Sequence, residues 1–342
     1  MSRPEPSPVP EGDSGGASSR ESTREPLPDC TEVLGTDSVR VVASDRERRR
    51  GILFTFTAYL LWGFFPLYFL MLAPTGPWEV VAWRIILSFV FCVLLLTFTR
   101  TWGRLAAIVR QPRLLGWTAL AGILIYVNWQ TYLVATLTGN VIETSLGYFI
   151  NPVVTVLLGV LVLRERIDVM QWVAIGIVVA AVVVSVVAYG TVPWIALILA
   201  FSFGLYGLVK KRIGTAVDAV SGLTLESFWL LPVATVELIV VSATSGLTLF
   251  GYGAWHAVLV LLAGVVTAVP LLLFASGARR VPLTVVGLLQ FVTPILQFIV
   301  GAFILHEPMP PARWIGFGLV WIALILLTVD SLRSVRRART AG

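Results

Sequence analysis

One stretch of this sequence occurs twice, and the duplication limits the folds that the chain can adopt. Residues 146–176, LGYFINPVVTVLLGVLVLRERIDVMQWVAIG, align without a gap with residues 288–318, LLQFVTPILQFIVGAFILHEPMPPARWIGFG. The offset is 142 residues, and it places Pro152 on Pro294. Similarity at a fixed offset indicates two copies of one structural unit.

The composition places these copies in a lipid bilayer. The chain is 57% hydrophobic and only 13% charged, and its mean hydropathy is +0.88, which is too apolar for a soluble globule of this length. At about 20 residues per crossing, the apolar runs predict an all-α integral membrane protein with ten transmembrane helices. The predicted helices are 51–72, 79–99, 114–134, 142–163, 169–188, 193–209, 219–241, 256–277, 283–305 and 312–330. No run alternates as a barrel strand would.

The positions of lysine and arginine predict the topology. Basic residues precede the first predicted helix and follow the second, fourth, sixth, eighth and tenth, whereas the opposite loops contain essentially none except Arg313. Positive charge marks cytoplasmic loops, so we expect a multi-pass protein of the cell membrane with both termini in the cytoplasm. Because each copy has five helices, an odd number, the two copies are expected to be inverted relative to each other.

The predicted organisation has four parts. Residues 1–45 hold nine acids and four arginines among many Pro, Ser and Gly residues, which is typical of a disordered polar N-terminal tail. The first five-helix repeat is expected at 46–190 and the second at 191–332, followed by a basic cytoplasmic tail at 333–342. Inverted repeats of this kind place a cavity at their interface, which is the geometry of a transporter.

Ionisable residues inside the apolar runs are the first candidates for a functional site, because a charge facing lipid costs several kcal/mol. Arg84, Glu143, Glu226 and Glu237 lie within predicted helices, and the offset of 142 residues places Arg84 on Glu226. We expect Glu143, which is closer in depth, to be the ionic partner of Arg84. Arg84 either holds a substrate anion or gates the outer face, or else it forms a structural ion pair. Glu143 and Glu226 are candidates for a cavity or proton-relay role.

Neutral polar and aromatic residues complete the predicted pathway. Amide side chains inside spans bind helices together as often as they contact a substrate, and aromatic side chains also serve in packing. The candidates are Asn128, Asn151, Gln290, Trp62, Tyr148 and Tyr206. Prolines inside the runs free backbone carbonyls, and Pro152 and Pro294 are expected to form paired bends beside the cavity.

The motifs that are missing bear on other functions. There is no phosphate-binding G-x-x-x-x-G-K-[ST] loop, no H-E-x-x-H and no G-x-S-x-G elbow, so we expect no enzyme activity and no cofactor. The two cysteines, Cys30 and Cys92, offer neither a disulfide framework nor metal-ligand spacing. The arginines punctuate hydrophobic segments instead of forming a patch, so no nucleic acid partner is expected.

Several motifs resemble a known family. The sequence is similar to the RarD proteins, EamA-type permeases of the drug/metabolite transporter superfamily, over roughly residues 50–332. The motifs that carry the resemblance are YLLWGFFPLYF (59–69), ETSLGYFINPVVTVLLG (143–159), FSFGLYGLVKKRIG (201–214), LESFWLLP (225–232) and GVVTAVPLLLF (264–274). The resemblance implies a ten-helix inner-membrane permease built as two inverted five-helix repeats.

The predicted function is secondary transport, as export of a small organic metabolite or a drug-like amphipathic compound by alternating access. The expected partners are the lipid bilayer, a small-molecule substrate and protons as coupling ion, with a homodimer left open. The alternatives are an uncoupled facilitator or importer, a membrane-bound sensor or scaffold that uses the tail, and a lipid scramblase.

Overall fold

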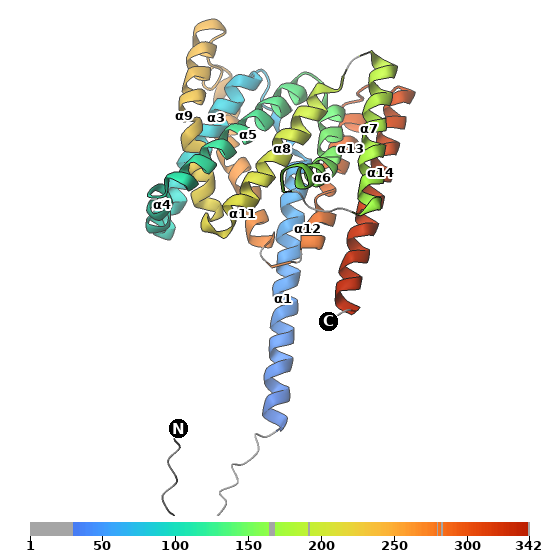
Figure 1. Ribbon diagram of the computed structural model, residues 1–342. Coiled ribbons are helices and arrows are strands. Elements are labelled where there is room, and N and C mark those ends of the chain that lie inside the picture. Colours follow the sequence, from blue (N-terminus) through green and yellow to red (C-terminus); the bar gives the residue numbers. More distant parts are fainter. Residues whose placement is uncertain (1–29, 164–167, 191, 279, 282, 341–342) are drawn as a thin grey trace, which may run out of the picture. The chain divides into compact units, whose positions relative to one another are not determined.

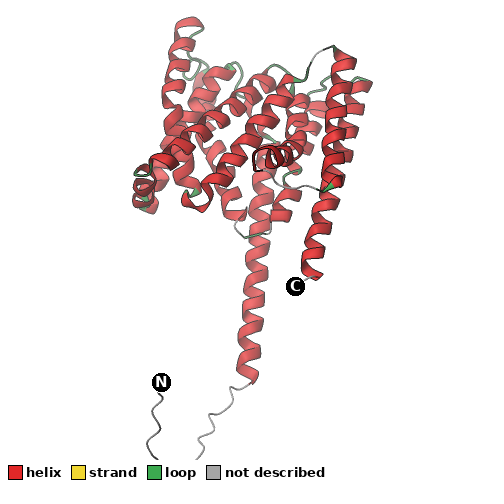
Figure 2. Ribbon diagram, viewed as in Figure 1, coloured by secondary structure: helices red, strands yellow, loops and turns green. Residues whose placement is uncertain are grey.

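The computed structural model describes residues 30–163, 168–190, 192–278, 280–281 and 283–340, and all regular secondary structure in these ranges is helical (Figures 1 and 2). The helices are α1 (Cys30–Gly63), α2 (Phe65–Leu70), α3 (Pro77–Thr99), α4 (Trp102–Val109), α5 (Pro112–Leu137), α6 (Val141–Leu163), α7 (Val169–Tyr189), α8 (Trp194–Ile213), η1 (Gly214–Ala216), α9 (Ala219–Thr244), α10 (Gly253–Leu261), α11 (Ala263–Ala278), α12 (Leu283–Leu289), α13 (Val292–Ile299), the π-helix η2 (Val300–Ile304) and α14 (Pro311–Thr340). Residues 46–342 form one compact unit, and the contacts below lie within it.

Seven helices of the described ranges are long and apolar enough to cross a membrane. They are Pro77–Thr99, Pro112–Leu137, Val141–Val162, Ala219–Thr244, Gly253–Ala278, Val285–Ile304 and Pro311–Asp330, and Val169–Val184 and Trp194–Lys210 are shorter apolar helices. The first predicted span, 51–72, is divided between α1 and α2 at Phe64. The all-helical membrane class is therefore confirmed, whereas the count of ten spans stays a prediction.

Helices that are related by the 142-residue offset pack against each other. α3 packs against α9, α6 against α13 and α7 against α14. The last pair lies side by side in Figure 1. Such contacts between equivalent elements are expected where two copies are related by an approximate two-fold axis.

Two equivalent glycines bring helix backbones close together. A Cβ atom on Gly264 of α11 would lie 2.5 Å from the carbonyl carbon of Leu87 in α3. The equivalent Gly122 of α5 packs on α9, where a Cβ atom would lie 3.1 Å from the backbone oxygen of Glu226. Because lipid tails are as apolar as leucine, helices in a bilayer associate through close packing rather than through the hydrophobic effect. These glycines allow that close packing at corresponding points of the two copies.

The loops predicted to be cytoplasmic contact one another. Arg280, which follows α11, donates from Nε to Glu47 Oε2 over 2.9 Å, and this hydrogen bond lowers the pKa of the exposed Glu47. The guanidinium of Arg212, at the end of α8, lies over the ring of Trp117 in the first turns of α5. The ends of helices that are distant in sequence thus meet on this side, while the alternation of loops across the membrane stays a prediction.

The opposite loops form a second set of contacts. Glu307, between η2 and α14, accepts hydrogen bonds from the backbone N–H groups of Val141 (2.6 Å) and Ile142 (2.9 Å). These N–H groups open α6 and have no acceptor within that helix. Burial raises the pKa of Glu307, against the effect of the two N–H donors. Elsewhere in this set Thr75 Oγ1 lies 2.7 Å from Thr248 Oγ1.

Three predicted boundaries can be compared with the helices. α1 begins at Cys30, within the tail predicted for 1–45, and residues 1–29 lie outside the described residues, so the extent of the tail stays a prediction. α14 continues as far as Thr340, through most of the basic tail predicted for 333–342. The single helix predicted for 283–305 divides between α12 and α13, since Pro294 cannot donate to the carbonyl of Gln290.

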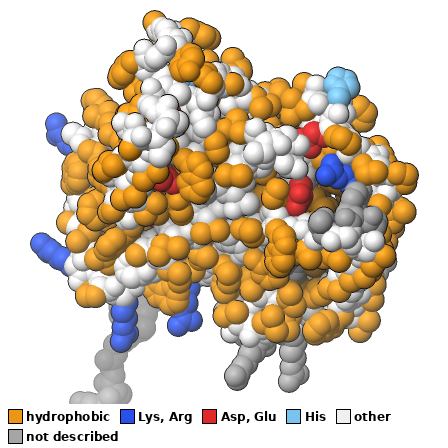
Figure 3. All heavy atoms as spheres, turned by 90° about the horizontal axis from the view of Figure 1, so that it is seen from above, with side chains coloured by type: hydrophobic (Ala, Val, Ile, Leu, Met, Phe, Trp, Pro, Cys, Tyr) orange, Lys and Arg blue, Asp and Glu red, His pale blue; other side chains and the backbone are white. Residues whose placement is uncertain are grey.

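Hydrophobic side chains cover much of the surface. Figure 3 shows them over most of the visible face, with few charged groups among them. The buried side chains form two main clusters. One is built mainly from α2, α3, α5, α9, α10 and α11, and the other from α6, α7, α8, α13 and α14. An apolar exterior of this kind is suited to lipid contact.

Candidate functional site

Arg84 is a buried cation in the middle of α3. Its side chain is only 4% exposed, and its Nε donates to Thr267 Oγ1 of α11 over 2.8 Å. The guanidinium carbon lies 4.1 Å from the centre of the Trp129 ring on α5, and the rings of Phe65 and Phe69 on α2 are within 5.8 Å. The site therefore joins the two copies of the repeat, since Thr267 belongs to the second copy and Arg84 to the first.

The guanidinium of Arg84 is incompletely paired. Its Nη1 atom is buried and has no hydrogen-bond partner among the residues that the structure describes. Within the same residues, no carboxylate forms an ion pair with it. Ring faces attract a cation by about 0.5–2 kcal/mol each, which offsets only part of the several kcal/mol that it costs to bury a charge. The buried charge of Arg84 is therefore only partly compensated by the described residues.

Glu143, the predicted partner of Arg84, makes a different contact. Its Oε1 accepts from the backbone N–H of Ile195 over 3.2 Å, at the beginning of α8. The first N–H groups of a helix have no intrahelical acceptor and carry partial positive charge, so the carboxylate is stabilised there. The expected ion pair with Arg84 is wrong for this structure.

Glu226, the equivalent of Arg84 in the second copy, is also buried but is paired. It is 2% exposed, and its Oε1 lies 2.5 Å from Lys210 Nζ on α8. Its Oε2 accepts from the Tyr206 hydroxyl over 3.1 Å. The sequence suggested only a topological role for Lys210. A lysine can extend its alkyl chain along apolar surface, so a helix-end residue reaches a carboxylate inside the span.

Five aromatic rings connect the surroundings of Arg84 with Glu226, and we call them the aromatic row. Successive ring centres are 6.1 Å apart for Phe69 and Tyr132, 5.9 Å for Tyr132 and Tyr148, 6.2 Å for Tyr148 and Phe203, and 6.0 Å for Phe203 and Tyr206. All are normal contact distances for aromatic pairs. Phe69 faces Arg84 and Tyr206 binds Glu226. The row thus links two opposite charges at equivalent positions of the two copies.

Prolines inside the helices leave some backbone carbonyls near this row without a helical hydrogen-bond donor. A proline has no N–H, so the carbonyl four residues before it loses its helical donor. Pro66 frees the carbonyl of Trp62, and that oxygen accepts from Gln297 Nε2 over 3.2 Å. By the same rule Pro152 and Pro294 free the carbonyls of Tyr148 and Gln290, two candidate residues that the sequence offset makes equivalent.

Prolines and bends are related differently in the two copies. Pro294 follows the break between α12 and α13, and Gln290 lies half-buried at this break. Pro152 lies inside the continuous helix α6. The predicted pair of bends is therefore observed as an interruption only at Pro294.

The amide candidates have distinct surroundings. Asn128 is buried and joins three helices, because its Nδ2 donates to Leu199 O and Ser202 Oγ of α8 while its Oδ1 accepts from the Tyr148 hydroxyl of α6. Asn151 is also buried, and its Oδ1 has no hydrogen-bond partner among the described residues. Asn128 thus has a packing role, and Asn151 retains a free acceptor.

The sequence gives no signal for Thr267 or Lys210 as site residues, whereas Gln297 is recognisable as a neutral amide inside an apolar run. Gln297 donates to Tyr132 over 3.3 Å as well as to the Trp62 carbonyl, so it connects α13 of the second copy with the first. Its repeat mate is Thr155, which gives no hint of this role. Threonine occurs widely in membrane helices, and only the three-dimensional contacts single out Thr267 and Lys210.

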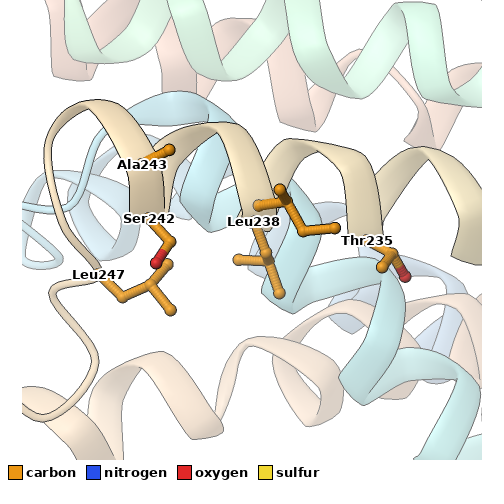
Figure 4. Close-up of a pocket in the computed structure, with 6 residues that line it drawn as sticks. Thr235, Leu238, Ser242, Ala243 and Leu247 are labelled. Atoms are coloured by element: carbon orange, nitrogen blue, oxygen red, sulfur yellow. The ribbon is translucent and has the colours of Figure 1, made fainter.

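An open hollow of about 490 Å³ lies apart from this site, near the end of α9. Figure 4 shows Thr235, Leu238, Ser242, Ala243 and Leu247 around it. Its neighbours on α9 are exposed hydrophobic residues, so it belongs to the apolar exterior. Within the described residues, no group of three or more His, Cys, Asp or Glu side chains could hold a metal ion.

Comparison with known proteins adds independent information. The model of the EamA-like transporter family matches twice in succession, at residues 49–187 and 191–329. Protein RarD of Streptomyces exfoliatus is 44% identical over 296 residues, which cover 86% of this chain and 93% of that protein. The uncharacterized transporter YojE of Bacillus subtilis (strain 168) is 41% identical over 298 residues, which cover 86% of this chain and 98% of that protein.

A solved structure shares the fold. It matches with a TM-score of 0.53 at 18% sequence identity, over 83% of this chain and 98% of that chain. At this level of identity the match speaks for the fold alone. The predicted resemblance to RarD and EamA-type permeases is confirmed by the family match and by the relatives.

Proposed function

Because this chain belongs to the EamA-like transporter family, we propose that it is a secondary permease that exports a small organic metabolite or a drug-like amphipathic compound by alternating access. The family and the relatives establish a membrane transporter of the drug/metabolite type. The proposal adds the direction, the mechanism and the residues of the pathway.

The observation that supports this proposal best is the pair of buried charges joined by the aromatic row. Arg84 and Glu226 are equivalent in the two copies, and ionisable side chains inside membrane spans mark pathways for ions and substrates. Around Arg84 and Gln297, residues of both copies meet. A molecule moving along this junction would pass from one charge to the other over aromatic faces.

The proposed architecture is ten crossings in two inverted repeats, 46–190 and 191–332, with both termini in the cytoplasm. The two sets of loop contacts support this alternation, because Glu47 meets Arg280 in one set and Glu307 meets Val141 in the other. In such a fold, alternating access is a rocking of one copy against the other.

We propose that the pathway is lined by Arg84, Trp62, Tyr148, Asn151, Tyr206, Glu226 and Gln290, with Asn128 and Glu143 supporting its walls. Protons are the proposed coupling ion, and Glu226 is the group to test, because its carboxylate is buried between Lys210 and Tyr206. A Glu226→Gln variant whose flux responded to an imposed pH gradient as the unsubstituted chain does would exclude this coupling.

The test of the proposed function begins with the substrate. Metabolites are compared inside and outside cells that contain or lack the chain, and a compound that the chain depletes from the cell is then measured by counterflow in proteoliposomes. We expect Arg84→Gln to abolish counterflow. Arg212→Gln is the matched control, because Arg212 also lies over a tryptophan ring but is exposed at a helix end.

Two results would contradict the proposal. One is an unchanged metabolite profile inside and outside the cells. The other is counterflow through Arg84→Gln at the rate of the Arg212→Gln control, since the junction around Arg84 would then not be the pathway.

A further inference from the structure

We infer that the transported compound is a singly charged organic anion with a flat aromatic body, and that its anionic group binds the free edge of Arg84. This inference rests on the proposed transport function and assigns the class of substrate to the same site. It follows from three observations. The Arg84 guanidinium lacks a hydrogen-bond partner at Nη1, the carboxylates of the proposed pathway already have donors, and aromatic rings surround Arg84.

The first step concerns the unpaired edge of Arg84. Nε is held by Thr267, whereas Nη1 is buried without a partner among the described residues. A guanidinium presents its N–H groups in a planar fork that matches the two oxygens of a carboxylate. Fixing Nε on Thr267 and the plane against Trp129 orients this fork before any ligand arrives. An incoming carboxylate would therefore supply the missing counter-charge.

The second step argues against a substrate cation at this position. An ammonium group would require a free carboxylate, and both carboxylates of the proposed pathway already have donors. Glu237 keeps one unpaired buried oxygen, Oε2, but it lies outside the proposed pathway, where its Oε1 accepts from the Tyr126 hydroxyl. Glu226 binds Lys210 and Tyr206, and Glu143 binds the Ile195 N–H. A cation would also be repelled by Arg84 itself. The site thus favours an anion over a zwitterion or an amine.

The third step limits the charge to one. In the described residues, Arg84 contacts Thr267 and aromatic rings, and none of these contacts is with a second cation. A doubly charged phosphate would leave one negative charge unpaired in a span, at a cost of several kcal/mol. A carboxylate leaves none.

The fourth step concerns the body of the ligand. Phe69 and Trp129 flank Arg84, and Tyr132 continues the aromatic row. Aromatic side chains stack with flat groups at separations like those within the row. The Tyr132 hydroxyl, which accepts from Gln297, is the first polar group along the row after Phe69 and can donate one hydrogen bond to such a body.

The test uses the full chain purified in detergent and a series of probes that share one ring but differ in charge. The probes are phenylacetate, phenylacetamide and phenethylamine, with cyclohexylacetate as the non-aromatic anion and chloride at equal concentration as the salt control. Binding is measured as the ligand-dependent rise of the melting midpoint. Loss of a charge-assisted hydrogen bond weakens binding on the order of tenfold to a hundredfold, so phenylacetate should bind more tightly than phenylacetamide by that factor.

Variants place the effect at Arg84. We expect Arg84→Gln to abolish the preference for phenylacetate over phenylacetamide, Arg84→Lys to retain part of it, and the control Arg212→Gln to keep all of it. The charge series in the unsubstituted chain is informative even if Arg84→Gln does not fold. Cyclohexylacetate should bind more weakly than phenylacetate, because its saturated ring has no flat aromatic face.

Several results would overturn the inference. They are equal binding of phenylacetate and phenylacetamide, tighter binding of phenethylamine, no binding of any probe, or a preference that survives in Arg84→Gln. Counterflow separates the two proposals. Phenylacetate binding without counterflow would leave the anion site standing and reject transport, whereas counterflow of phenylacetamide in preference to phenylacetate would keep transport and reject the anion site.

Discussion

Replacing Gly264 by alanine should separate α3 from α11 and destabilise the protein. The added Cβ would lie 2.5 Å from the carbonyl carbon of Leu87 and 2.7 Å from its oxygen. Carbon atoms in favourable contact are about 3.5–4.0 Å apart, so the two backbones have to move apart by about 1 Å. Both sides of the clash are backbone, and no side chain can rotate to relieve it.

The magnitude follows from two opposing effects. Overpacking costs about 1–3 kcal/mol, and a clash between backbones belongs at the upper end. Replacing glycine by alanine inside a helix stabilises the helix by about 0.5–1 kcal/mol. We therefore expect Gly264→Ala to lower the free energy of unfolding by about 2 kcal/mol. Because Arg84 lies one turn from Leu87 on the same helix, the displacement should also impair transport.

The assay is denaturant-induced unfolding of the detergent-solubilised protein, with two matched alanine variants. Gly122→Ala adds a Cβ 3.1 Å from a backbone oxygen, so its smaller clash and its helix gain should nearly cancel. Gly116 lies in α5, as Gly122 does, and a Cβ added to it would have no atom within 4 Å, so Gly116→Ala should be slightly stabilising. If Gly264→Ala were as stable as Gly116→Ala, the close approach of α3 and α11 would be refuted.

Three further predictions concern the charged groups and the topology. Glu307→Ala should lower the midpoint of thermal unfolding, because two buried N–H groups lose their acceptor and each unpaired group costs at most about 3 kcal/mol of stability. An unchanged midpoint would show that this cap is dispensable. Lys210→Met should destabilise the fold by about 1–3 kcal/mol. This loss is smaller than for a fully enclosed ion pair, because the lysine side chain is 35% exposed. Adding Glu226→Gln should restore part of the lost stability in a double-mutant cycle. Cysteines placed at Arg110 and Tyr252 should react with an impermeant thiol reagent from opposite sides of the membrane, and labelling from one side would contradict the inverted repeats.

The duplication carried most of the fold information that could be read from the sequence. The offset places Arg84 on Glu226, and both side chains are buried at equivalent positions of α3 and α9. The family model likewise matches the chain twice, at residues 49–187 and 191–329. Hydropathy also predicted helices throughout, because period and length are local properties of the sequence.

The pairing of the charges could not be predicted in the same way. Depth in the membrane favours Glu143 as the partner of Arg84, but depth along a helix axis does not say which neighbour a side chain faces. The beginning of α8 lies beside Glu143 and supplies N–H donors there. Lys210 directly follows a predicted helix and so indicates only a loop charge, because the sequence cannot show how far its alkyl chain extends into the span. Such contacts depend on helix packing, which hydropathy does not encode.

The interruption at Gln290 distinguishes the two members of one pair of equivalent helices. Tyr148, its equivalent, is part of the continuous helix α6, whereas Gln290 lies between α12 and α13. If one copy rocks against the other as proposed, only the second member of this pair has a joint at which to bend, so the inward-open and outward-open forms need not have equal free energy. The apparent affinity for a solute would then differ between the two faces of the membrane, because the fraction of molecules whose site is open to one face would differ from the fraction open to the other.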